Sequence, residues 1–276
     1  MTRLIKADFK KFFKDKLFFV SCILAVIFAV ITPLLYVLIS SSLGDDPMAE
    51  ELLSGLVSSK GLFFSAFTVG NDFGLIVPLL IGIVMFKDFS YGTVRNKIIS
   101  GHSRSSIFLS NYIVCFITLF GITLAYAFLT LGVSLPFFDY QSTPFKLADF
   151  WYAIKSLLFE MCIYLFVAAF ISLLCVLMKS VGLVIVVYIA VVFGSSLISG
   201  IIQGVLFVLT GNPDFELVVN ILDTILRINV FNSSSTIGTD TVYIFEDVIY
   251  YVIVPLAGAL GLIGLGMLRF RRKDLK

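Results

Sequence analysis

The side chains best suited to chemistry lie in one polar stretch of twenty residues, Lys87–Ser106, with the sequence KDFSYGTVRNKIISGHSRSS. It separates two long apolar runs and holds the only histidine of the chain. Its basic residues and its histidine are Lys87, Arg95, Lys97, Arg104 and His102. A short amphipathic helix here would expose Arg95, Lys97 and Arg104 beside Val94, Ile98 and Ile99. Such a helix offers a partner protein a surface that is both cationic and apolar. A basic loop that only orients the chain in a membrane is the alternative.

Patterns for catalysis or for binding metals and nucleotides are absent from the sequence. It has no GxxxxGK[ST] loop for nucleotide phosphates and no HExxH zinc motif. His102 has no second histidine to work with. The four cysteines lie inside apolar runs without a CxxC pair, which is typical of buried structural residues. We therefore expect no catalytic residue, no metal site, no cofactor and no nucleic-acid partner, and we expect energy for any vectorial work to come from another chain.

The composition predicts an all-α polytopic membrane protein. Hydrophobic residues make up 59% of the chain and charged residues 14%, with a mean hydropathy of +1.05. A helix needs about 20 apolar residues to cross a bilayer, and six runs are long enough. The expected spans are 17–39, 62–86, 107–131, 157–178, 181–210 and 248–268, within a single transmembrane domain covering 1–276.

The distribution of charge predicts the orientation of these spans. With both termini inside the cell, sixteen of the 20 Lys and Arg residues lie on the cytoplasmic side, including those of the 87–106 loop. Most of the acidic residues then lie outside. By the positive-inside rule this predicts a six-span, N-in and C-in protein of the cell membrane.

The first sixteen residues are expected to form an amphipathic helix in the membrane interface. Phe9, Phe12 and Phe13 lie on one side, and Lys6 and Lys10 lie on the other. Such a helix places its rings in the acyl region and its lysines among anionic headgroups, so membrane lipid is an expected partner. The alternative is a simple basic flank to the first span.

Polar residues within apolar runs are candidates for a translocation path. Asn71 and Asp72 interrupt the second run and either line a path or cap a broken helix. Glu160 is the most deeply placed ionisable residue, expected near the outer end of the fourth span, and either acts in transport or makes a structural hydrogen bond. Gln203 in the fifth run is a further candidate. An external segment, 211–247, is expected to contain a helix over Phe215–Val230.

The polar stretch resembles a motif of the permease subunits of bacterial type-2 ABC exporters. That family has an acidic residue, a Gly-Thr-hydrophobic-Arg-Asn sequence and a small-x-Ser-Arg sequence in this loop. The matching residues here are Asp88, Gly92, Thr93, Val94, Arg95 and Asn96, followed by Gly101, His102, Ser103 and Arg104. The family more often has glutamate at the acidic position. The resemblance covers about twenty residues in motif and the whole chain in the expected topology.

This resemblance implies a cytoplasmic coupling helix that docks on a separate ABC ATPase, which would hold ATP and Mg²⁺. It also implies a second permease subunit, in a homodimer or a related heterodimer, with the substrate passing between the two. The apolar, aromatic-rich spans favour an antimicrobial or amphipathic peptide over a drug, lipid or sodium. Two alternatives remain at this point: a channel or carrier working without ATP, and a membrane scaffold giving immunity to a peptide.

Overall fold

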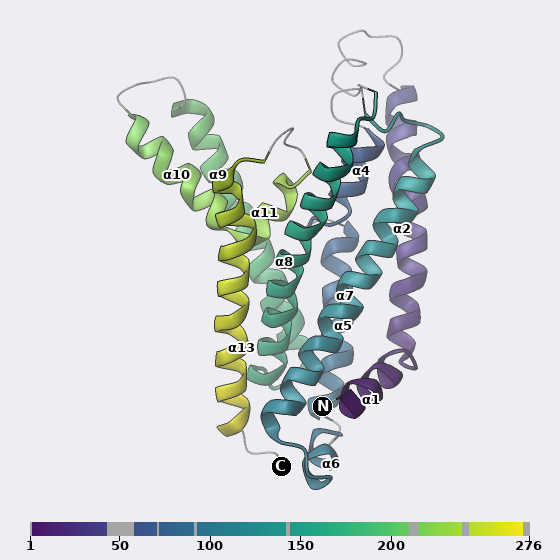
Figure 1. Ribbon diagram of the computed structural model, residues 1–276, viewed down its shortest axis with the longest axis vertical. Helices are drawn as coiled ribbons and strands as arrows, with labels where there is room; N and C mark the ends of the chain where they lie inside the picture. Colours follow the sequence, from purple (N-terminus) through teal and green to yellow (C-terminus); the bar gives the residue numbers. More distant parts are fainter. Residues whose placement is uncertain are drawn as a thin grey trace.

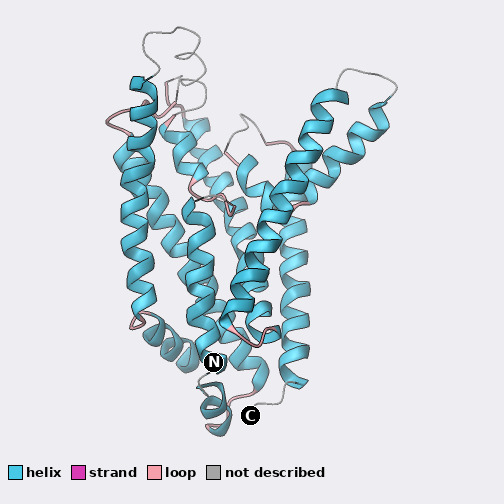
Figure 2. Cartoon of the chain, turned by 180° about the vertical axis from the view of Figure 1, so that it is seen from behind, coloured by secondary structure: helices cyan, strands magenta, loops and turns pink. Residues whose placement is uncertain are grey.

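The computed structural model describes residues 2–42, 58–70, 72–90, 93–141, 144–209, 215–238 and 243–272. Within these ranges all regular secondary structure is helical (Figure 2). The helices are α1 (Thr2–Phe12), α2 (Lys16–Ser42), α4 (Ser59–Ser65), α5 (Asp72–Ser90), α6 (Thr93–Ile99), α7 (Arg104–Ser134), α8 (Leu147–Leu177), α9 (Val181–Leu209), α10 (Glu216–Ile228), α11 (Val230–Thr236), α12 (Phe245–Val248), the π-helical turn η2 (Ile249–Ile253) and α13 (Val254–Arg272).

The described residues include five helices that are long and apolar enough to cross a membrane. They are α2, α7, α8, α9 and the continuous helix formed by α12, η2 and α13. A sixth is present if α5 and α6, which are bent by 51° relative to each other, count as one span. The prediction of an all-helical, multi-pass membrane protein is therefore confirmed.

The bundle has two distinct ends, which we name after the short helices found there. At the α6 end lie α1, α6 and the last residues of α13, so the chain begins and finishes at the same end (Figure 1). At the α4 end, α9 and α10 diverge from the other helices (Figures 1 and 2). The predicted helix over Phe215–Val230 is present as α10, and it exposes apolar residues such as Leu217 and Ile221.

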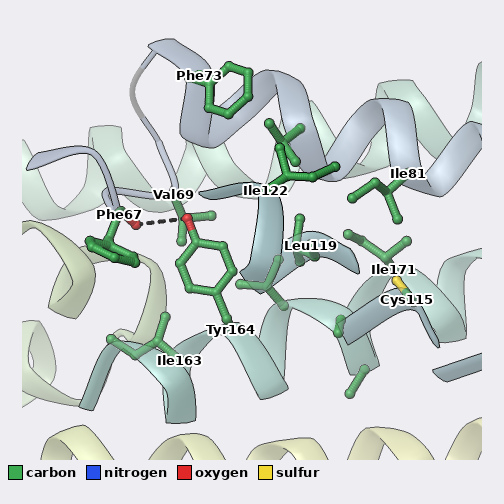
Figure 3. Packing of buried hydrophobic residues seen from close by; sticks show 14 of the residues in the cluster. Phe67, Val69, Phe73, Ile81, Cys115, Leu119, Ile122, Ile163, Tyr164 and Ile171 are labelled. Atoms are coloured by element: carbon green, nitrogen blue, oxygen red, sulfur yellow. Dashed lines mark hydrogen bonds between the residues drawn. The ribbon is translucent and has the colours of Figure 1, made fainter. Parts of the chain in front are cut away.

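The second predicted span, 62–86, contains the interruption expected near Asn71 and Asp72 and is not one continuous helix. Helix α4 ends at Ser65 and α5 begins at Asp72. The backbone between them is tied into the core (Figure 3), because the Tyr164 hydroxyl donates a hydrogen bond to the carbonyl oxygen of Phe67 at 3.1 Å. The amide of Val69 donates to Ser234 Oγ, also at 3.1 Å. Backbone N–H and C=O groups that lose their helical hydrogen bonds at membrane depth must form hydrogen bonds with other parts of the protein, as they do here.

Helix α8 lies at the centre of the bundle and is longer than predicted. It packs against α5, α7, α9 and α13. It begins at Leu147, ten residues before the predicted start, because Asp149 accepts a hydrogen bond from the Lys146 amide at 2.7 Å and caps the first turn. Glu160 therefore lies near the middle of this helix, whereas it was expected near the outer end of a shorter span.

Candidate functional site

The polar stretch predicted to meet a partner lies at the α6 end and contains a short helix, as expected. Helix α6 is terminated by Gly101, whose φ of +88° suits glycine. The Gly101 amide donates to the Ile98 carbonyl at 2.9 Å, and the His102 amide donates to the Lys97 carbonyl at 3.2 Å. These two bonds form the Schellman motif that commonly ends a helix. Residues 93–102 thus form a helix and its terminating turn.

One face of α6 is attached to the rest of the bundle. Val94 is buried against Leu4 of α1, Phe108 of α7 and Phe270 of α13. Lys97 Nζ lies 2.6 Å from Asp8 Oδ1 and its side chain is only 11% exposed. The prediction that α6 exposes Val94 and Lys97 was wrong, because both side chains contact the bundle.

Asp8, Lys11, Asp88 and Lys97 form an ion cluster, which we call the inner ion cluster. Lys97 Nζ also lies 3.7 Å from Asp88 Oδ2, and Lys11 Nζ pairs with Asp88 Oδ1. The side chains of Asp8 and Asp88 are 3% and 4% exposed. Buried carboxylates are tolerated only when cations and hydrogen-bond donors compensate them. The cluster therefore fixes α1 to the end of α5 and to α6.

Hydrogen bonds extend the inner ion cluster into α7 and α6. Ser110 Oγ donates to Asp8 Oδ2 at 2.7 Å, and Lys97 Nζ donates to Asn111 Oδ1 at 3.3 Å. Lys11 Nζ lies 3.2 Å from Thr93 Oγ1. Polar contacts thus connect α6 and the inner ion cluster directly to α1, α5 and α7.

A second ion pair attaches the segment after α1 to α5. Lys87 Nζ lies 3.0 Å from Asp15 Oδ2. Burial disfavours the charged form of Asp15, but the Leu17 backbone N–H and the Lys87 ammonium outweigh it, so the pKa of Asp15 is lowered. The pair therefore remains charged at neutral pH. Its contribution to the stability of the fold is lost only as the pH falls through this lowered pKa.

The opposite face of α6 points away from the bundle. Arg95, Asn96 and Ile99 are exposed, and the Ile99 side chain is 74% accessible. Arg95 and Ile99 are four residues apart and so share one side of the helix. Among the described residues no carboxylate pairs with Arg95. This face is the part of the predicted motif that a partner can reach.

Three other residues of the motif have different surroundings. Arg104 Nη1 donates to the carbonyls of Phe270 at 3.4 Å and Arg271 at 2.8 Å. It therefore satisfies the C-terminal end of α13, and it is partly buried rather than freely exposed as predicted. His102 is half-buried in the turn, and Gly92 lies outside the described residues.

The phenylalanines of α1 do not share one environment. Phe12 is buried in the protein core, Phe9 is half-buried and Phe13 is 50% exposed. The buried stripe is Leu4, Asp8 and Phe12, at a spacing of four. The prediction that Phe12 lies in lipid was therefore wrong. Asp8 was not predicted to be functional, although an acid on the protein-facing stripe of an amphipathic helix signals a buried partner.

The predicted path residues are not brought together. Asn71 and the side chain of Asp72 lie outside the described residues, although α5 begins at Asp72. Gln203 is exposed on α9 and lines a polar cavity of 430 Å³ at the α4 end, together with Asp223, Arg227 and Tyr251. Glu160 is 0% exposed inside the bundle, and neither carboxylate oxygen has a hydrogen-bond partner in the described chain.

We expect Glu160→Gln to leave the stability of the protein unchanged or to raise it. An ionised carboxylate without a partner is costly in such surroundings, whereas a neutral amide of the same shape avoids that cost. The measurement is thermal unfolding of the purified chain, with Gln203→Glu, an exposed site, as the control. A loss of about 3 kcal/mol or more in Glu160→Gln would contradict the expectation, since it would mean that a compensating group holds the carboxylate.

No curated protein matches the chain. A protein-family profile matches residues 67–276, which include helices α5 to α13 and therefore α6 with Arg95 and Lys97. The family is described as "Protein of unknown function (DUF2705)". Since the match covers most of the 276 residues, the chain belongs to the DUF2705 family.

Proposed function

We propose that the chain is the membrane permease subunit of an ATP-driven ABC exporter and that α6 is its coupling helix. The observation that carries the proposal is the two-faced environment of α6. Lys97 and Val94 fasten one face to α1, α5 and the bundle, while Arg95 and Ile99 project from the other. A helix that transmits force needs both a rigid attachment and an accessible contact surface. The accessible face belongs to the segment that resembles the exporter motif.

The proposed topology has six spans with both termini in the cytoplasm. Helix α5 has 19 residues, which at about 1.5 Å per residue gives a length of roughly 28 Å, close to the thickness of a hydrocarbon core. The start of α2 and the end of α13 lie at the same end of the bundle, which supports an even number of crossings (Figure 1). Arg95, Arg269 and the lysines of α1 gather at that end, which favours the cytoplasmic side of the cell membrane.

The proposed partners are a cytoplasmic ABC ATPase, which would bring ATP and Mg²⁺, and a second permease subunit. An antimicrobial or amphipathic peptide is the proposed substrate. The polar cavity at the α4 end and the exposed apolar residues of the neighbouring α10 supply both kinds of surface that such a peptide presents. Glu160 is enclosed by protein. Its position therefore does not support the alternative of a carrier that works through this residue.

The test is the charge reversal Arg95→Glu. The tagged chain is purified from the cells that naturally produce it, and co-purification of the proposed ABC ATPase is measured. We expect loss of ATPase co-purification or at least a tenfold fall in its stimulation by the chain, because a charged contact at the centre of an interface is worth about 2 kcal/mol or more. Membrane insertion and unfolding temperature should not change, since Arg95 contacts solvent.

The matched control is Lys179→Glu, the same reversal at an exposed residue between α8 and α9. It should leave co-purification and hydrolysis intact. Transport by the reconstituted chain without nucleotide hydrolysis would overturn the proposal. So would wild-type levels of coupled hydrolysis in Arg95→Glu.

A further inference from the structure

A groove lined by apolar side chains runs between α1, α2 and α7, apart from the inner ion cluster. Its volume is 380 Å³. Phe9 of α1, Phe13 just after α1 and Phe18 of α2 line it near the α6 end. Gly121 and Ile122 of α7 line it further along. A cavity with such walls on the side of a membrane bundle suits a hydrocarbon chain.

The length of the groove matches one leaflet of a bilayer. On α7 its lining extends from Ile117 to Leu129, which corresponds to about 18 Å of helix, and half of a hydrocarbon core is about 15 Å. The hollow exists because small residues occur at Gly121 and Ala125. A Cβ atom built on Gly121 meets no atom within 4 Å, so this wall opens onto free space.

Two exposed lysines adjoin, along the chain, the residues that line the groove near the α6 end. Lys10 and Lys14 directly follow Phe9 and Phe13 in the chain, and both lysines are exposed. They line a shallow hollow together with Ala7, Lys11 and Asp15, and the carboxylate of Asp15 is paired with Lys87. Within the part of the chain that the structure describes, neither lysine pairs with a carboxylate, whereas the neighbouring Lys11 is paired with Asp88.

We propose that the groove is a binding site for one anionic phospholipid of the leaflet at the α6 end. One acyl chain lies between α2 and α7, and the phosphate contacts Lys10 and Lys14. The apolar groove alone would accept any lipid, and the two uncompensated lysines select a net negative headgroup. This inference requires that the bundle spans a membrane and does not depend on the exporter function.

The test is native mass spectrometry of the detergent-purified full chain, titrated with dioleoyl phosphatidylglycerol or with dioleoyl phosphatidylcholine. We expect retention of one phosphatidylglycerol in preference to phosphatidylcholine. The double variant Lys10→Gln with Lys14→Gln should retain phosphatidylglycerol about thirtyfold more weakly, the factor that two lysines contribute at an anionic surface. Its retention of phosphatidylcholine should not change.

Gly121→Leu tests the acyl chain separately. The new side chain fills the groove, and we expect about tenfold weaker retention of phosphatidylglycerol, as steric overpacking produces. Gly132→Leu is the control, because Gly132 is also on α7 with open space around its Cβ position and lies outside the groove. Unfolding temperatures equal to that of the parent chain would show that both variants fold.

Two results would overturn the proposal. One is equal retention of the two lipids by the parent chain, which would mean that the lysines do not select a headgroup. The other is equal retention of phosphatidylglycerol by Gly121→Leu and Gly132→Leu, which would mean that the lipid is not held in the groove. A failure of Arg95→Glu to disturb an ATPase would leave this lipid site intact.

Discussion

Lys97→Met is expected to lower the free energy of unfolding by about 3–5 kcal/mol, the cost of removing one partner from a buried ion pair. Methionine keeps the length of the side chain but removes the cation 2.6 Å from Asp8 and 3.7 Å from Asp88. Among the described residues, Asp8 then keeps only the hydroxyl of Ser110 as a donor, and the two buried carboxylates also repel each other. The measurement is thermal unfolding in detergent, with an expected fall in Tm of about 10 °C.

Arg95→Met is the matched control on the same helix. Arg95 is exposed, so this variant should change stability by no more than about 0.5 kcal/mol. Adding Asp8→Asn to Lys97→Met removes the uncompensated charge and should recover part of the loss, which a double-mutant cycle measures. Equal Tm values for Lys97→Met and Arg95→Met would show that the inner ion cluster does not stabilise the fold.

The two variants also divide the motif into residues that attach α6 and residues that we propose to contact the partner. Lys97→Met should weaken the attachment, whereas Arg95→Met should leave the fold intact and affect only binding to an ATPase. The sequence predicted one common role for these residues, because both are basic and only two positions apart. Their different roles depend on which side of α6 faces α1, which is a tertiary property.

Local signals in the sequence predicted the elements of the α6 end well. The helix within 87–106 follows from its amphipathic periodicity, whereas the turn at Gly101 was found in the structure. The pairing of Asp8 with Lys97 could not be predicted in this way, since the residues are far apart in the chain. Only the packing of α1 against α7 brings them together.

Counting apolar residues predicted that helices cross the membrane but misplaced some of their ends. Helix α8 begins at Leu147 because Asp149 caps it, whereas the apolar run begins only at residue 157. A capping residue marks a helix start more directly than hydropathy does. The division between α4 and α5 was predicted from the polar residues near Asn71. Its position at residues 66–71 reflects contacts with Tyr164 and Ser234, which are distant in sequence.

Gly74→Ala is expected to lower the free energy of unfolding by about 3 kcal/mol, at the upper end of the usual cost of overpacking. A Cβ atom at this position would overlap the carbonyl oxygen of Thr68 and lie 2.9 Å from its carbonyl carbon. Backbone atoms cannot rotate away as a side chain can. Thr68 is also held on both sides, by the hydrogen bonds from Tyr164 to Phe67 and from Val69 to Ser234.

Gly132→Ala is the control for this substitution, because its Cβ position on α7 meets no atom within 4 Å. Alanine favours the helix over glycine, so the free energy of unfolding should be unchanged or rise by at most about 1 kcal/mol. Hydrogen exchange of the Val69 amide, measured beside the Tm, locates the effect. Faster exchange in Gly74→Ala would mean that the strain is relieved by opening the connection between α4 and α5. Unchanged Tm and exchange in Gly74→Ala would show that the close approach of Thr68 to Gly74 does not hold this broken span in place.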